Sequence, residues 1–155
     1  MPKYSFILWL AVPRKLRTRD RLRFIPTDPS CVFCRHEEES HSNLFFTCNW
    51  TFCLWGKIKS WLRIGRSMLT FNSAIRGLNS RRNNLDARMR RVFLGITIYL
   101  IWEERNKRIF EDKSLGIDAV FRRLKGTVSS WMLAEGYYRW LFGSFIVLWL
   151  WFFGD

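Results

Sequence analysis

Apolar side chains recur every three or four residues in several stretches of the chain, and this spacing is that of one face of an α-helix. The clearest stretch covers residues 117–132, where the apolar face lies opposite Arg122, Arg123 and Lys125. Two further helices are predicted over residues 49–62 and from about residue 85 to residue 100, and residues 63–84 are interpreted as a loop with one short helix. No strand pattern competes, so a mainly α fold is predicted. The apolar positions are Phe52, Trp55, Ile58, Trp61, Leu62, Met89, Val92, Phe93, Ile96, Leu100, Ile117, Val120, Phe121, Leu124, Val128, Trp131 and Met132.

Two apolar runs lie near the ends of the sequence. Residues 4–12 follow a single Lys3 and lack the pattern of a signal peptide, so we expect them to be buried. Residues 140–153 carry no charge, but they are fewer than the roughly 20 apolar residues that cross a bilayer as a helix. The apolar C-terminal tail, residues 137–155, is therefore interpreted as a last core helix or an aggregation-prone end. The alternative is a helix in a membrane interface, where Arg139 would reach the headgroups.

The charge is strongly positive and concentrated near the N-terminus. The 155 residues contain 26 Lys+Arg and 13 Asp+Glu, a formal net charge of +13, which favours a polyanionic partner such as nucleic acid or an anionic membrane surface. The hydroxyl of Thr18 is expected to cap a short helix that begins near residue 19. The basic residues of this segment are Arg14, Lys15, Arg17, Arg19 and Arg21.

Residues 28–53 are polar and contain all four cysteines, too few for a disulfide-rich scaffold. Cys31 and Cys34 form a C-x2-C pair, which is typical of structural zinc sites, although a redox dithiol has the same spacing. A closed zinc site takes four ligands, and His36, His41, Cys48 and Cys53 are all within reach. The best set is Cys31, Cys34, His41 and Cys48, with residues 42–47 as a strand or turn before the helix. His36 is then a solvated loop residue and Cys53 a free core thiol.

The acidic residues do not predict a catalytic site. Nucleotidyl-transfer chemistry needs clustered carboxylates that hold two metal ions. Glu37, Glu38 and Glu39 are interpreted as a solvated loop, and Glu103 and Glu104 as partners of surface ion pairs with the basic residues that follow them. The sequence shows no glycine-rich phosphate loop and no Ser/His/Asp arrangement. We expect a non-catalytic protein without a small-molecule substrate.

Six segments of the chain together carry a family pattern: PKYSFILWLA (2–11), LRTRDRL (16–22), DPSCVFC (28–34), ESH (39–41), LFFTC (44–48) and IWEERNKRIF (101–110). In this combination they resemble the zinc-binding domain of plant non-LTR (LINE-type) retroelement reverse transcriptases. The resemblance covers residues 2–125 and implies a small helical domain in which Cys31, Cys34 and Cys48 bind zinc. That family has a histidine directly before its Leu-Phe-Phe-x-Cys motif, whereas this chain has Asn43, so either His41 takes the fourth position or three protein ligands and a water remain.

The expected function is that of a zinc-binding module that contacts RNA or DNA without sequence specificity. The basic segment would bind phosphates, and Phe33 and Trp50 would stack on unpaired bases. A second basic set consists of Arg81, Arg82, Arg88, Arg90 and Arg91. The alternative is a decayed retroelement fragment that associates with membranes or proteins through its apolar C-terminal tail.

Overall fold

The protein is a helical bundle in a computed structural model that describes residues 2–22, 24, 26, 28–78 and 87–134. Within these residues no strand forms, and the one β feature is an isolated bridge between Ser30 and Glu38. The mainly α prediction is therefore confirmed. In chain order the elements are α1 (Pro2–Ala11), the 3-10 helix η1 (Arg19–Arg21), the π-helix η2 (Asn43–Thr47), α2 (Asn49–Trp61), α3 (Phe71–Leu78), α4 (Ala87–Phe110) and α5 (Ile117–Ala134).

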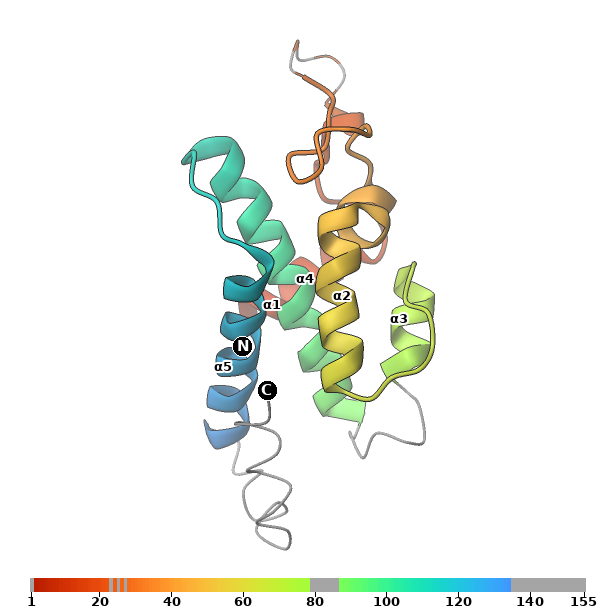
Figure 1. Ribbon diagram of the computed structural model, residues 1–155, viewed down its shortest axis with the longest axis vertical. Helices are drawn as coiled ribbons and strands as arrows, with labels where there is room; N and C mark the ends of the chain where they lie inside the picture. Colours follow the sequence, from red (N-terminus) through yellow and green to blue (C-terminus); the bar gives the residue numbers. More distant parts are fainter. Residues whose placement is uncertain (1, 23, 25, 27, 79–86, 135–155) are drawn as a thin grey trace, which may run out of the picture.

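Helix α4 is the central element of the bundle (Figure 1). It contacts α1, α3, α5 and η2, and α2 packs against α5 and η2. Because α4 has neighbours on several sides, Ile96, Ile98 and Ile101 are all fully buried although they do not share one face. Trp61 of α2 joins three helices, since its ring lies 5.6 Å from Phe93 of α4 and 5.9 Å from Phe121 of α5.

Helix α1 is only half covered, which corrects the expectation that residues 4–12 are buried. One side packs on α4, where the rings of Tyr4 and Tyr99 meet edge to face at 4.9 Å. A Cβ added at Gly95 would lie 3.4 Å from the Tyr4 carbonyl oxygen, which is van der Waals contact and leaves no room for a larger side chain in that direction. The other side is largely open, since Phe6 and Trp9 are 55% and 61% exposed, and the Lys15 Nζ lies 5.4 Å from the Trp9 ring.

The remaining helices follow the sequence pattern closely. Helix α5 buries Val120, Leu124, Val128, Trp131 and Met132, as its apolar stripe predicted. Helix α3 is the short helix expected within residues 63–84. In α2 the prediction was wrong in one position, because Phe52 is exposed while Leu54 is buried.

The Thr18 cap is also wrong in its details. The short helix η1 does begin at Arg19, but the Thr18 side chain makes no cap hydrogen bond to the backbone. Its hydroxyl donates instead to the Asp20 carboxylate.

Some sequence predictions fall outside the described residues. These are the apolar C-terminal tail, residues 137–155, together with Arg81, Arg82 and the side chain of Arg88, and the membrane association of the tail stays a prediction. Among the helices that the structure describes, none combines the length and the apolar character needed to cross a membrane.

Candidate metal centre

Cys31 and Cys34 lie on a tight loop that its own backbone closes. The Cys31 N–H donates to the Glu37 carbonyl oxygen at 2.8 Å, and the Arg35 N–H donates to the Cys31 carbonyl oxygen at 2.8 Å. The chain turns at Arg35, which has a left-handed φ of 55°. The Glu39 N–H then returns to the Pro29 carbonyl oxygen at 2.9 Å, so the loop is closed at its base as well.

Cys48 reaches the same place from the junction between η2 and α2. Its N–H donates to the Asn43 carbonyl oxygen at 2.9 Å, which ends the π-helix, and its extended ψ of 136° starts α2 on a new axis. The Thr51 hydroxyl donates to the Cys48 carbonyl oxygen at 3.0 Å. The expected strand or turn over residues 42–47 is thus a helical turn, and it fixes the Cys48 backbone on both sides.

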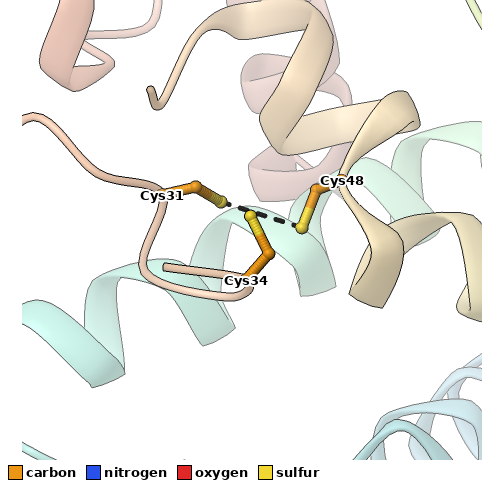
Figure 2. Close-up of side chains that lie close together, drawn as sticks. All are labelled: Cys31, Cys34 and Cys48. Atoms are coloured by element: carbon orange, nitrogen blue, oxygen red, sulfur yellow. Dashed lines mark hydrogen bonds between the residues drawn. The ribbon is translucent and has the colours of Figure 1, made fainter. Parts of the chain in front are cut away.

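Figure 2 shows the three thiols pointing toward one another, two from the loop and one from the start of α2. All three sulfur atoms lie within 4.8 Å of one another, and the Sγ atoms of Cys31 and Cys48 are 3.8 Å apart. Cys31 and Cys48 are buried and Cys34 is half-buried. Ligands at about 2.3 Å from a zinc ion at the corners of a tetrahedron lie about 3.8 Å apart. The Cys31 and Cys48 sulfur atoms therefore have the spacing of two zinc ligands, and the Cys34 sulfur lies within 4.8 Å of both.

The protonation of the group also suits a soft cation. Donation of a hydrogen bond to Cys48, together with burial, raises the pKa of the Cys31 thiol. Accepting that bond lowers the pKa of Cys48. A metal ion bound here would displace the proton of this hydrogen bond, since metal binding takes the thiolate form.

The structure does not bring His41 into this group. Among the described His, Cys, Asp and Glu residues, the metal-competent group consists of Cys31, Cys34 and Cys48 alone. The His41 ring packs against Phe45 at 4.9 Å and Phe71 at 5.6 Å, in an aromatic cluster. Burial, with the nearby charges of Arg21 and Arg14, lowers the pKa of His41 to about 4. Three of the four predicted ligands are therefore together, and the fourth lies apart.

The other two candidate ligands lie outside the group, as expected, but one of them differs in burial. His36 is exposed on the loop. Cys53 is an exposed residue of α2 rather than a core thiol, and its Sγ lies 3.9 Å from the Asn49 side-chain oxygen. The apolar residues around position 53 suggested that Cys53 is buried, but its side chain points away from the core.

Asn43 is the polar residue whose importance the ligand pattern alone missed. It is 3% exposed, and its Nδ2 donates to Oε2 of Glu37 at 2.5 Å. Its Oδ1 is buried and has no hydrogen-bond partner among the described residues. The signal that pointed to it was its place in the resemblance, where the family has histidine.

Glu39 corrects the prediction of a solvated acidic loop. Glu37 and Glu38 are exposed, but Glu39 is fully buried. Its Oε1 accepts from Nη2 of Arg105 on α4 at 2.7 Å and from the Arg19 N–H at 3.0 Å. This buried ion pair attaches the cysteine loop to the central helix.

The predicted ion pairs of α4 are present. Glu103 pairs with Lys107 at 3.8 Å and Glu104 with Arg108 at 2.8 Å, each one helical turn apart. Glu104 is nevertheless buried, since its carboxylate also accepts from the Leu115 N–H at 2.7 Å.

The basic segment lies beside the cysteine loop. Arg14, Lys15, Arg17 and Arg21 are exposed. Arg19 is half-buried, because its guanidinium donates to the Ser30 carbonyl oxygen and lies 3.8 Å from the Asp28 carboxylate.

A cleft borders the loop on its α4 side. It has a volume of about 410 Å³ and is lined by basic side chains that include Arg19, Arg35 and Arg108, together with Asp28 and Asp112. Phe33 in this cleft stacks on Trp50 at 4.4 Å, and the Arg108 guanidinium lies 4.8 Å from the Phe33 ring and 5.2 Å from the Trp50 ring. The two aromatic residues expected to stack on bases thus stack on each other.

Comparison with known protein families agrees with this geometry. Residues 1–55 match the family described as zinc-binding in reverse transcriptase. The matched segment is about one third of the chain and includes all three clustered cysteines and Asn43. No curated protein and no solved structure matches the chain.

Proposed function

We propose that this protein is a non-catalytic zinc-binding module, derived from a plant non-LTR retroelement reverse transcriptase, that contacts RNA or DNA through phosphates. The observation that carries the proposal is the group of three thiols, all within 4.8 Å of one another, inside the segment that matches the zinc-binding family. Three thiolates give the ion enough charge to make it a poor Lewis acid, which favours a structural role. Zinc would join the loop to the start of α2, two segments that already meet through the stacked rings of Phe33 and Trp50.

Nucleic-acid binding is supported by the charge and its position. The net charge is +13, and four exposed basic residues lie next to the cysteine loop. If each of the four neutralises one phosphate of a single strand, the logarithm of affinity falls with the logarithm of salt with a slope of about −2.8. Affinity then drops about 50-fold between 50 mM and 200 mM salt.

The zinc proposal is tested by elemental mass spectrometry on the purified full chain. We expect one zinc per chain in the natural sequence, none in Cys34→Ser, and one in Cys53→Ser. Cys53 is the matched control because it is a free cysteine in the same segment but lies outside the thiol group. Equal zinc loss in both variants, or no zinc in the natural sequence, would overturn the proposal.

The nucleic-acid proposal is tested by titrating a labelled single-stranded RNA at several salt concentrations. Replacing Arg14, Lys15, Arg17 and Arg21 with Gln should reduce the slope by about 2.8. The control replaces an equal number of exposed arginines elsewhere, Arg63, Arg66, Arg76 and Arg122, and so has the same net charge. If both sets reduce the slope equally, binding depends on net charge alone and the basic segment is not the interface.

A further inference from the structure

A closed zinc site needs a fourth donor, and the described titratable residues do not supply one. The three thiols form a group by themselves, and His41 packs in an aromatic cluster outside it, although its buried Nε2 also has no hydrogen-bond partner among the described residues. The carboxylates of the described residues also lie outside the group. The fourth donor must therefore be a neutral polar group or a water.

Asn43 has an oxygen atom that lacks a partner. Its side chain is 3% exposed and its buried Oδ1 has no hydrogen-bond partner among the described residues. Leaving a buried acceptor unsatisfied costs about 1–3 kcal/mol, so such an atom needs an explanation. A bound cation would provide one, because an amide oxygen can coordinate zinc, although more weakly than an imidazole nitrogen does.

The position of Asn43 ties it to both cysteine-bearing segments. Its carbonyl oxygen accepts from the Cys48 N–H, and its Nδ2 donates to Glu37. Glu37 in turn accepts from the Cys31 N–H through its carbonyl oxygen. Asn43 thus lies between Cys48 and the Cys31 loop, within two hydrogen bonds of each.

Glu37 also settles which end of the amide is available. An ionised carboxylate only accepts hydrogen bonds, so the amide group that faces it must be the NH2 group. The oxygen is left as the free end. Donation from Nδ2 to a carboxylate also raises the electron density on Oδ1, as outer hydrogen bonds do for other metal ligands.

We propose that Asn43 Oδ1 is the fourth ligand of the zinc site and that Glu37 positions the amide for it. This inference rests on the proposed zinc-binding function. It replaces both sequence-based alternatives, in which His41 or a water completes the site. A site with three sulfurs and one amide oxygen keeps the charge of a three-cysteine, one-histidine site but has a harder and weaker fourth donor.

The test combines X-ray absorption of the zinc-loaded full chain with zinc affinity from competition against a chromophoric chelator. The natural protein should show three sulfur neighbours at about 2.3 Å, one oxygen at about 2.0–2.2 Å, and no imidazole scattering. Asn43→His should add imidazole scattering and bind zinc more tightly, and Asn43→Ala should weaken binding by at least 10-fold. Glu37→Gln, which removes the charge that orients the amide, should weaken it less.

His41→Phe is the matched control, since it keeps the aromatic packing and removes the alternative ligand. It should leave the absorption spectrum and the affinity unchanged. Imidazole scattering in the natural protein that is lost in His41→Phe would overturn the proposal in favour of His41. Unchanged affinity in Asn43→Ala together with an unchanged spectrum in Asn43→His would overturn it in favour of water. If the natural protein contains no zinc surrounded by three sulfur atoms, the zinc-binding function itself is refuted, and this result is distinct from the other two.

Discussion

Removing one member of the buried ion pair between Glu39 and Arg105 is expected to be among the most costly substitutions in the protein. The side chains are 0% and 5% exposed, and the guanidinium approaches Oε1 of Glu39 through both Nη2 and Nε, at 2.7 and 3.2 Å. Arg105→Met would leave a buried carboxylate whose strongest partner is gone. Uncompensated buried charges of this kind cost about 3–5 kcal/mol.

That cost is large compared with the stability of a domain of this size. Typical free energies of unfolding are about 5–15 kcal/mol, so the loss is a third or more of an average value. At about 2–4 °C per kcal/mol, the melting temperature should fall by roughly 6–20 °C. The backbone of Glu39 also closes the cysteine loop at Pro29, so zinc affinity should fall together with stability.

The assay is urea unfolding of the zinc-loaded chain, followed by circular dichroism and arranged as a double-mutant cycle. Glu39→Leu combined with Arg105→Met should recover most of the loss, since no unpaired buried charge remains. The control is Asp118→Asn, which breaks the exposed 2.8 Å pair between Lys57 and Asp118 and should cost less than about 1 kcal/mol. A cost below about 1 kcal/mol for Arg105→Met, or a double variant as unstable as the sum of the single ones, would refute the reasoning.

Three further outcomes are expected. Gly95→Val should destabilise the contact of α1 with α4 by about 1–3 kcal/mol in chemical unfolding, because the added side chain meets the Tyr4 backbone, whereas Gly126→Ala, at a position with open space, should be neutral or stabilising. The pKa of His41 is about 4 in the folded protein and about 6.5 in the unfolded chain, so the unfolded chain binds more protons between these values. Stability should therefore fall by about 3 kcal/mol as the pH falls from 6.5 to 4, and His41→Phe should lack that part of the pH dependence; parallel curves would contradict it. Removal of zinc with a chelator should increase hydrogen exchange in residues 28–48 while the exchange of α5 stays unchanged, and uniform protection loss would show that the metal holds the whole bundle.

Local periodicity was sufficient to predict most of the helices. In α5 the apolar stripe packs against one side of the bundle, so the buried residues of the helix all belong to the predicted stripe. In α1 the same reasoning fails, because an apolar run does not reveal how many neighbours the helix has. Among the described helices α1 packs mainly on α4, and the exposed side of the helix retains Phe6 and Trp9.

The metal centre was predictable only as far as residue type and spacing specify it. The C-x2-C pair and Cys48 were found because thiols have few other roles in a polar segment. The position of His41 was not predictable, because the direction in which its side chain leaves a short helical turn decides whether the ring meets the sulfur atoms or Phe45. The burial of Glu39 depends on a partner 66 residues away, and no local pattern contains that information.

The Glu39–Arg105 pair also shows that the segment that matches the family in sequence depends on residues outside the match. The family match ends at residue 55, yet the cation that neutralises Glu39 is supplied by α4, and α1 and η2 rest on the same helix. A fragment cut at the boundary of the match would keep every proposed zinc ligand and lose the surface against which they are arranged. The cysteine-bearing segment thus depends for its shape on residues far along the chain.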